Sequence, residues 1–575
     1  MSAYINGQSV SVPSVVITTD DQPLTTGSST PTLGLLLIGP ANDGAPNTPL
    51  TFTDLNQAIR ALNSGDLVQA IANAFQPSGS RPAVNTLTAI QVNPLTTASS
   101  TIPPVSGSVD FPLTTTHYGE EANTAQWQLT SGTTLGYQFS QRMNGLAAGN
   151  TPYKTVTQDD IGINALTLYY SGTGTSPTLT ITDSAVTVSA TTSDQGGTVT
   201  LGSSTSLAQV AADLNAFPGW NATVVATNPN QTTAAFFDNV SAVTVPTSST
   251  SPYTLTAHVY ALAQYFSQQA IYFTGTRPAN ATALTTSSTW TTASGATSPA
   301  ATNTNWQDAY TTAQSLPGIG IVTPISSSES IWDMNDAHCH YMASIGSGRR
   351  GYTGDALGAT ISTETADAAL INSNRTSIVW PGVKGTDVNG NATTFAPYVS
   401  SAPMVASMRA AAPATQALTG ATLLTTGLEQ AVGPTTAGTA NAGGVMALYT
   451  DLVTGAVKIS WDRTTWLQST AADKVENTVG IEVDLLTQDL NQALQAFISP
   501  VASPGDVGAA AETLYQRLLY WYGQGTIVVE PQQQNISLSA SNGVISGTVQ
   551  VTMGIPTNYV AVTLQLQAGV ITAVA

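Results

Sequence analysis

The chain has 575 residues, which at about 100 to 200 residues per domain predicts three to five domains with sizeable cores. Only 8% of the residues are charged, and 33 acidic against 14 basic side chains leave a net charge of −19. A surface of this sign repels phosphate backbones and anionic membranes, so nucleic acid and lipid are excluded as expected partners. Solubility rests instead on Ser, Thr, Asn and Gln, which favour strands and turns.

The chain carries no obvious export or membrane signal. Its single cysteine, Cys339, cannot form an internal disulfide, and the first residues, MSAYINGQSV, lack the basic and then apolar pattern of a secretory leader. The longest strongly apolar stretch, LGLLLI over 33–38, is much shorter than the ~20 residues that cross a bilayer. We therefore expect a protein made in the cytoplasm, a buried strand at this stretch, and no membrane insertion.

The first hundred residues predict an arm followed by an α/β unit. Residues 1–22 predict an extended arm, because the segment before Asp20 is free of charge, β-branched residues flank Pro13 and no helical period is present. Residues 23–97 predict the first part of an α/β core, with an apolar strand, a Gly/Pro/Asn loop, two amphipathic helices and a further strand. Thr53 or Asp54 is expected to cap the first helix.

Residues 98–300 differ in character and predict an inserted, β-rich part. Ser- and Thr-rich runs alternate with apolar residues, and Gly, Pro and Asn separate them. No basic residue lies between Lys154 and Arg277, and one helix is expected over 206–216. We expect this insertion to fold separately and to face outward.

The α/β pattern then resumes, which predicts a core that is discontinuous in sequence. Residues 301–400 form its second part, and 401–557 predict a C-terminal domain with a hairpin that turns at Thr454-Gly455. Residues 558–575 predict a C-terminal β arm. The expected fold class is thus α/β (α+β) and multidomain, with a discontinuous core, an inserted β-rich domain and extended terminal β arms.

The two ends of the chain share an unusual lack of charge. The 45 residues from Pro531 to Ala575 contain no Asp, Glu, Lys or Arg, although they alternate like strands. Free strand edges of this kind recruit other chains, so we expect them to be paired.

The sequence signals for metal, nucleophile and nucleotide sites are weak, so we expect that the protein is not an enzyme and binds no cofactor. One cluster has the residue types of a metal or nucleophile site, but on the expected helix its two histidines diverge: Asp333, Asp336, His338, Cys339 and His340. Gly346, Gly348 and Gly351 match G-x-G-x-x-G, but they follow a helical pattern instead of a strand, which favours a helix end and loop. No phosphate-binding loop of the G-x-x-x-x-G-K-[ST] type is present.

The basic residues concentrate late in the chain. Eight of the 14 fall within 346–475. They predict either a solvated surface with ion pairs or a charged face that meets a neighbouring protein, and the sequence leaves both open.

At this point the motifs resemble a known family. The segment LLLIGPANDGAPNTPLTFTDLNQAIRALNSGDLVQAIANAF resembles the opening of contractile-tail sheath proteins, in which a strand ends at Gly-x-Ala and a Gly-x-x-Asn-x-Pro loop follows. The insertion, with ALTLYYSGT and VTVSATTSDQGGTVTLGSSTSLAQVAADLNAFPGWNATVVA, is similar to that of the Mu-like branch. The residues that fill the first motifs are Gly39, Ala41, Gly44, Asn47 and Pro49, and Ser64, Gly65 and Leu67 form a permuted version of a later Gly-Ser-x-Leu turn.

The resemblance implies a structural subunit with no catalytic residues. Six-fold sheath rings would stack around a tail tube, exchange β-strands between subunits, and shorten to drive the tube through the host envelope. Expected partners are the chain itself, the tube, baseplate and tail terminator proteins, and the expected location is the phage tail, assembled in the host cytoplasm.

The resemblance and the uncharged ends together predict the contact residues. In the N-terminal arm these are Tyr4, Ile5, Val10, Val12, Val15, Val16 and Ile17. In the C-terminal arm they are Tyr559, Val560, Val562, Leu564, Leu566, Val570 and Ile571. The C-terminal domain, 401–557, is expected to face the tube, and its acidic helix suggests Glu482, Asp484 and Asp489 as contacts. Two alternatives stay open, a non-contractile lattice or tube protein and a carbohydrate-binding adhesive β protein.

Overall fold

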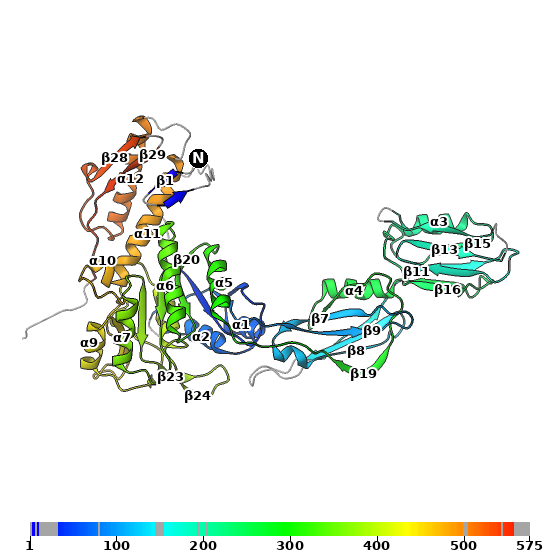
Figure 1. Cartoon of the computed structure of the whole chain (residues 1–575), viewed down its shortest axis with the longest axis horizontal. Helices are drawn as coiled ribbons and strands as arrows, with labels where there is room; N and C mark the ends of the chain where they lie inside the picture. Colours follow the sequence, from blue (N-terminus) through cyan, green and yellow to red (C-terminus); the bar gives the residue numbers. More distant parts are fainter. Residues whose placement is uncertain are drawn as a thin grey trace, which may run out of the picture.

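The computed structural model describes residues 3–5, 8–10, 33–78, 81–143, 155–191, 195–202, 205–497, 504–541 and 544–556. Figure 1 shows an α/β body, a part made of helices and strands above it, and an insertion that reaches far to one side. Among the described residues, no helix has both the length and the apolar composition that crossing a membrane requires.

An eight-stranded sheet forms the centre of the body, in the spatial order β27-β26-β22-β21-β20-β3-β5-β4. The six inner strands are parallel, and β4 and β27 run antiparallel at the two edges. The strands are β3 (Gly34–Gly39), β4 (Pro49–Phe52), β5 (Leu87–Gln91), β20 (Ile319–Pro324), β21 (Arg350–Thr353), β22 (Thr376–Trp380), β26 (Val445–Thr450) and β27 (Val457–Ile459). Because β3 pairs with both β5 and β20, segments on either side of the insertion share one sheet, which confirms the discontinuous core.

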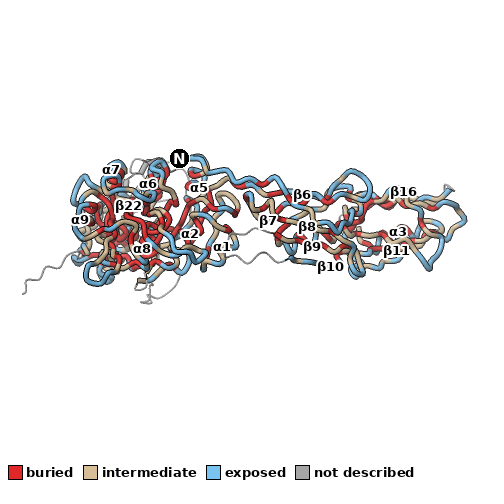
Figure 2. The backbone as a smooth tube through the Cα atoms, turned by 90° about the horizontal axis from the view of Figure 1, so that it is seen from below, coloured by how far each residue is buried: buried red, intermediate tan, exposed pale blue. Residues whose placement is uncertain are grey.

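Helices cover both faces of this sheet, which is why its inner strands β20, β21 and β22 are buried at every position instead of at alternate ones. One face packs against α1 (Leu55–Leu62), α2 (Asp66–Phe75) and α8 (Ser401–Ala411). The other packs against α5 (Asn303–Gln314) and α6 (Glu329–Ser344), with α7 (Ile361–Ile371) beside α6 and α9 (Pro434–Ala442) beside α7. Figure 2, in which the backbone is coloured by burial, shows this buried centre around β22 and α8.

Local sequence signals set several element ends as expected. The Asp54 carboxylate accepts a hydrogen bond from the Gln57 amide and caps α1. The hairpin β26–β27 turns at Gly455, whose φ of 71° lies in the left-handed region. A small sheet beside the body has the order β24-β23-β25 and comprises β23 (Val383–Thr386), β24 (Ala392–Phe395) and β25 (Gly427–Leu428).

The insertion consists of two nested lobes, each with its own hydrophobic core. The inner lobe combines a three-stranded sheet, a four-stranded sheet and α4 (His258–Gln268). Its strands are β6 (Thr97–Ile102), β7 (Phe111–Tyr118), β8 (Ala125–Ser131), β9 (Tyr137–Met143), β10 (Val156–Ile161), β18 (Phe273–Gly275) and β19 (Ser287–Thr292), and a 3-10 helix, η1 (Glu120–Thr124), lies between β7 and β8.

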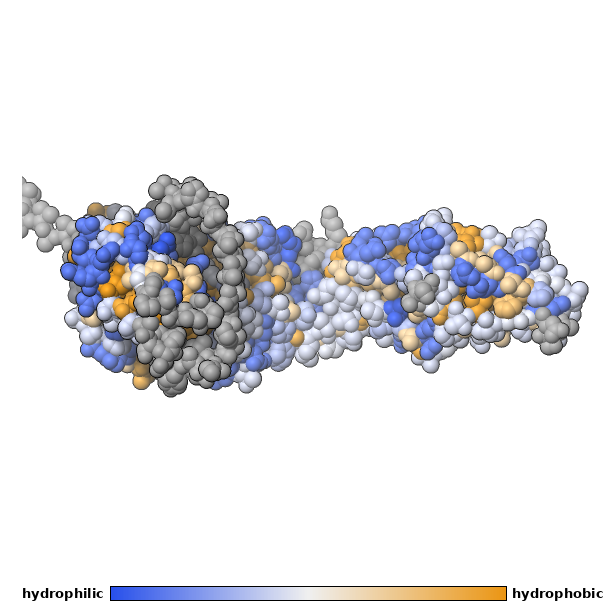
Figure 3. All heavy atoms as spheres, turned by 90° about the horizontal axis from the view of Figure 1, so that it is seen from above, coloured by the Kyte–Doolittle hydropathy of each residue, from blue (hydrophilic) through white to orange (hydrophobic). Residues whose placement is uncertain are grey.

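The outer lobe repeats this plan with one helix, α3 (Leu207–Asn215), which Ser206 caps. Its strands are β11 (Asn164–Tyr170), β12 (Thr178–Ile181), β13 (Ala185–Ser189), β14 (Gly197–Thr200), β15 (Trp220–Val224), β16 (Val240–Thr244) and β17 (Tyr253–Thr256). The surface of both lobes mixes polar, weakly polar and apolar patches in the view of Figure 3, without one continuous apolar face.

The C-terminal part rises from the body next to the N-terminal strands (Figure 1). Its elements are α10 (Ala472–Val475), α11 (Asn477–Leu494), η2 (Gln495–Phe497), α12 (Pro504–Gly523), η3 (Gln533–Asn535), β28 (Ile536–Ser541) and β29 (Val544–Val549). α12 packs against α11 and against β28. The N-terminal strands are β1 (Ala3–Ile5) and β2 (Gln8–Val10).

Candidate functional site

The place where α/β sheets most often bind ligands is filled in this protein. Strand order reverses between β3 and β20, and ligands of open α/β sheets usually bind beyond the strand ends at such a point. Here the amide of Ile325 donates to the carbonyl oxygen of Ile38 at 2.7 Å. A Cβ placed on Gly39 would lie 2.5 Å from that of Ile325, which is itself buried. The chain therefore occupies the crevice with its own side chain.

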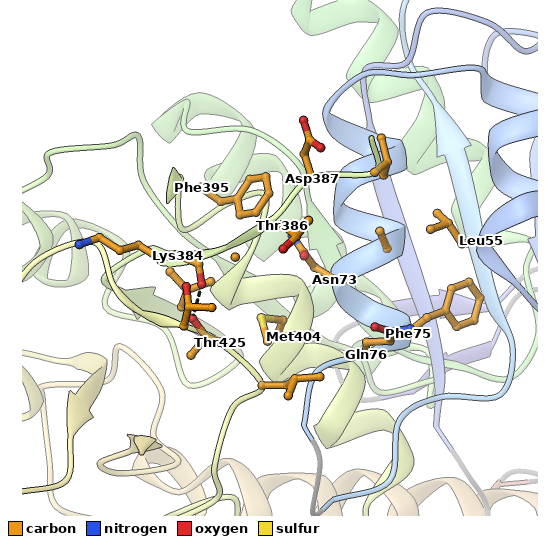
Figure 4. Close-up of a pocket in the computed structure, with 16 residues that line it drawn as sticks. Leu55, Asn73, Phe75, Gln76, Lys384, Thr386, Asp387, Phe395, Met404 and Thr425 are labelled. Carbon is orange, nitrogen blue, oxygen red and sulfur yellow. Dashed lines mark hydrogen bonds between the residues drawn. The ribbon is translucent and has the colours of Figure 1, made fainter. Parts of the chain in front are cut away.

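A groove of about 470 Å³ lies between α2 and the hairpin β23–β24 (Figure 4). Its polar groups serve local structure: Asn73 donates to the carbonyl oxygen of Val399 at 2.9 Å, and Asp387 accepts the amides of Asn389 and Asn391. These hydrogen bonds, that of the Asn391 amide first, lower the pKa of Asp387. Much of the remaining wall is apolar, including Leu55, Phe75, Phe395 and Met404. The groove thus lacks converging polar groups of the kind that catalysis requires.

The histidine and cysteine cluster of α6 is divided between the core and the surface: His338 and Cys339 are buried, whereas Asp333 and His340 are exposed. Burial raises the pKa of Cys339 to about 12, so the side chain is a thiol and not a nucleophilic thiolate at neutral pH. Burial and the neighbouring Arg349 lower the pKa of His338 to about 4, and Nη1 of Arg349 lies 2.9 Å from Nε2 of this histidine. Across the described ranges, no group of three or more His, Cys, Asp or Glu side chains is arranged to hold a metal ion.

Buried arginines connect the C-terminal part to the core sheet. Asp484 on α11 accepts Nη2 of Arg375 at 2.8 Å and Nε of Arg350 at 3.2 Å, at the starts of β22 and β21. The close fit leaves no room for larger residues, since a Cβ on Gly480 would overlap the Arg350 guanidinium. We call Arg350, Arg375 and Asp484 the arginine hub.

A second buried pair lies on α8. Arg409 and Asp462 both have fully buried side chains, and their Nη1 and Oδ2 atoms are 3.5 Å apart. Arg349 and Arg463 are buried as well. Together with Arg350 of the arginine hub, four of the late basic residues are therefore buried inside the subunit and lie neither on a solvated surface nor on a face that meets a neighbour. Of these four, Arg350 and Arg409 form the expected ion pairs.

The ends of the described chain present open strand edges. β1 and β2 pair only with each other, and so do β28 and β29, within the part of the chain that the structure describes. The edges of the core sheet differ: the segment around Leu423 hydrogen-bonds along β27, and β4 is short and begins with a proline. Because β28 and β29 have six residues each and no charge or proline, nothing in their sequence blocks a further strand.

Comparison with solved structures shows which proteins share this fold. The sheath tail protein Lin1278 of Listeria innocua superposes with a TM-score of 0.54 at 13% identity, over 91% of this chain and 92% of its own. The sheath tail protein DSY3957 of Desulfitobacterium hafniense gives a TM-score of 0.52 at 13% identity, over 92% and 93%. The chain has the tail sheath fold.

The sequence comparison is narrower. The chain is 30% identical over 184 residues to a protein named "Putative tail sheath protein" from Enterococcus phage phiEF24C. This match covers 32% of the chain and 30% of the relative, so it spans less than a third of the relative's length. No known protein-family profile matches the chain.

In this tail sheath fold, hydrogen bonds fix the insertion to the body. Asp43, in the loop after β3, accepts the Tyr118 amide at 2.7 Å and lies 2.5 Å from Nδ1 of His117 on β7. Asn93 bonds the carbonyl oxygen of Ala41 and the amide of Ala301, and so clamps both connecting segments.

A similar device joins the two lobes. Asp238 of the outer lobe accepts the amides of His258 and Val259 at 2.9 and 3.0 Å, and so caps the start of α4. It also accepts the hydroxyl of Thr256 at 2.7 Å. Neither Asp43 nor Asp238 was singled out from the sequence, because their partners are distant in the chain.

The predicted contact residues fall into three groups. Tyr4, Ile5 and Val10 lie in the β1–β2 hairpin, where the backbone pairs Tyr4 with Ser9 and Ile5 with Gln8. The remaining predicted arm residues lie outside the described residues: Val12, Val15, Val16, Ile17, Tyr559, Val560, Val562, Leu564, Leu566, Val570 and Ile571.

The three acidic residues predicted to meet the tube have partners or burial inside the subunit. Glu482 is buried, and burial raises its pKa to about 8 although the Arg409 charge opposes the shift. Asp484 belongs to the arginine hub, and Asp489 accepts Arg517 at 2.8 Å. A tube contact through these three carboxylates stays a prediction.

Proposed function

We propose that this chain is the structural subunit of a contractile tail sheath, polymerising as stacked six-fold rings around a tail tube. The observation that carries the proposal is the match to sheath tail proteins over more than nine tenths of both chains. The filled crevice and the inert α6 cluster agree with a role without catalysis. As such a subunit it would belong to a phage tail assembled in the host cytoplasm, with baseplate and tail terminator proteins at the two ends of the polymer.

The open edges of β28 and β29 support the linkage part of the proposal, which is strand exchange between copies. A strand added along the outer edge of β28 or β29 would complete a ladder of six residues. With about six hydrogen bonds at roughly 0.5 to 1.5 kcal/mol net each, one added strand contributes about 3 to 9 kcal/mol. The uncharged ends of the chain supply the strands. Because head-to-tail contacts of this kind do not close on themselves, they generate a helical tube.

The rigidity of the subunit supports contraction by movement between subunits. The hydrogen-bonded junctions at Asp43 and Asp238 and the arginine hub hold lobes, body and C-terminal part together. We infer that the assembled sheath has two packings of the same rigid subunit, with the extended packing trapped above the contracted one. Differences of a few kcal/mol per subunit add along the tube, so no nucleotide is needed.

Electron microscopy of the purified protein, alone and co-expressed with a tube protein, tests the proposal. Long hollow striated tubes are the expected result. Flat sheets would point to a lattice protein, and monodisperse monomers to an adhesive protein; either result would overturn the sheath function.

Deletion variants test the linkage separately. Removal of Met1–Thr19, or of Tyr559–Ala575, is expected to give folded monomers that do not polymerise. The matched control removes the outer lobe, residues 164–256, and joins the ends with a short Gly-Ser link, since the Ala257 amide lies 2.9 Å from the carbonyl oxygen of Ile163. Because this lobe lies far from the terminal strands (Figure 1), the control is expected to polymerise. Tubes from both arm deletions would contradict the strand-exchange model.

A further inference from the structure

One acidic side chain in the body lacks any compensating group. Glu364, in the first turns of α7, is fully buried, and both of its carboxylate oxygens lack a hydrogen-bond partner within the described part of the chain. Buried carboxylates are normally hydrogen-bonded or paired, because a charge without compensation is very unfavourable in a medium of low dielectric constant. Glu364 therefore requires a different explanation from the buried carboxylates of the arginine hub.

The surroundings of Glu364 make its charge still less favourable. Its charged neighbours are Asp355 before the helix, Asp367 one turn later and Glu429 after β25, and all three are acidic. β22, α9 and β26 pack against α7 and contain no Asp, Glu, Lys or Arg, and α6 contributes Glu329, which acts on Asp367. Burial and these like charges raise the pKa of Glu364 far above its ordinary range.

Asp367 shares this environment. It is largely buried, and burial together with Glu329 and Asp355 raises its pKa to about 6. Since no described group of acidic side chains here is arranged for a metal ion, a proton is the cation that can neutralise Glu364 where it lies.

We propose that Glu364 and Asp367 form a proton-operated latch that holds the start of α7 and the loop 355–360 against the core sheet. Protonated, Glu364 packs as a neutral side chain under this loop. Deprotonated, it carries a charge that the site cannot compensate, and the helix start must open to hydrate it. The structure thus assigns to this face of the body a conformation that depends on pH.

Hydrogen bonds hold the loop 355–360 in place and define which contacts an opening of α7 would break. Glu429 accepts the Gly358 amide and, at 3.1 Å, the Gly382 amide. The carbonyl oxygen of Ala359 accepts the indole N–H of Trp380 at 2.9 Å. These contacts are the ones that opening would break. Leu357, on the same loop, is half exposed, so movement of the loop would change the exposure of this apolar side chain.

The sign of the effect follows from linkage. The pKa of Glu364 is raised in the folded state above its ordinary 4.5, so the latch is fully stabilised below pH 4.5. Its stability falls as the pH rises from there toward the folded-state pKa. For one proton released on opening, the opening equilibrium constant increases about tenfold per pH unit in this window.

Hydrogen exchange on the full chain tests the latch. Rates at amides of 361–371 are measured from pH 5 to pH 8 in the wild type and in Glu364→Gln, and their ratio is taken at each pH so that the intrinsic pH dependence of exchange cancels. We expect this ratio to rise with pH, by at most about tenfold per pH unit, and to level off above the folded-state pKa of Glu364, while the ratio for α3 amides stays at one. A ratio for α7 that does not change with pH overturns the proposal.

Two further variants guard against indirect effects. Asp308→Asn removes an exposed carboxylate from α5 and is expected to leave the wild-type behaviour of α7 unchanged. Glu364→Met fills the site with an apolar side chain of similar length. Like Glu364→Gln, it is expected to make the opening of α7 independent of pH above about pH 6, where Asp367 is already charged. A Met variant whose α7 opens further as the pH rises above 6 would assign the proton to another group and refute the latch.

Discussion

Replacement of Asp484 by alanine is the sharpest test of the packing described above. The carboxylate is 12% exposed and compensates Arg350, which is 3% exposed, and Arg375, which is 13% exposed. The alanine variant leaves one buried and one partly buried guanidinium group without their counter-charge. Removal of one partner from a buried ion pair typically costs about 3 to 5 kcal/mol, and we expect this loss where α11 docks on the sheet.

The assay must report local stability, because a chain with several cores does not unfold in two states. Native-state hydrogen exchange at amides of 477–494 provides this, and the expected loss of protection is roughly a hundredfold to several thousandfold. Asp489→Ala on the same helix is the matched control, because its partner Arg517 is 39% exposed and the pair is worth about 1 kcal/mol. An equal loss of protection in the two variants would refute the reasoning. If α11 keeps its protection in Asp484→Ala, the Asp484 carboxylate is not needed for packing and is available for a tube contact.

Three further perturbations test other parts of the structure. Gly39→Val forces a branched side chain against Ile325, and differential scanning calorimetry should show the body transition destabilised by about 1 to 3 kcal/mol with the lobe transitions unchanged. Asp238→Ala removes the cap of α4, and hydrogen exchange in α4 should increase as expected for a loss of about 1 to 3 kcal/mol in local stability. Unchanged protection of α4 would show that Asp238 does not stabilise the junction between the lobes. Glu482 has a pKa raised by burial from 4.5 to about 8, so its contribution to stability falls from pH 4.5 to about pH 8, and Glu482→Gln should flatten the decline of stability measured by urea titration in this range.

Much of the element pattern could be predicted from the sequence because it depends on local signals. Asp54 caps α1, Ser206 caps α3 and Gly455 turns the β26–β27 hairpin, each through contacts within a few residues. The division of the insertion into two lobes could not be predicted in the same way. Ser- and Thr-rich alternation runs through both lobes, so no change of composition marks their boundary near Ile163 and Ala257, and only strand pairing and separate cores reveal it.

Buried strands such as β3, the interruption of the α/β core and the lack of charge at both ends can be recognised in the amino-acid sequence. These features follow from the spacing of residues that are neighbours in the chain. The positions of the sparse charges, in contrast, depend on how the chain folds. Arg350 and Asp484 are 134 residues apart in sequence, and linear spacing contains no information about such a pair. The sequence suggests that these charges lie on the surface, but in the structure they form an ion pair that connects α11 to the core sheet. A charge removed from water is tolerated only where the fold brings a partner to it.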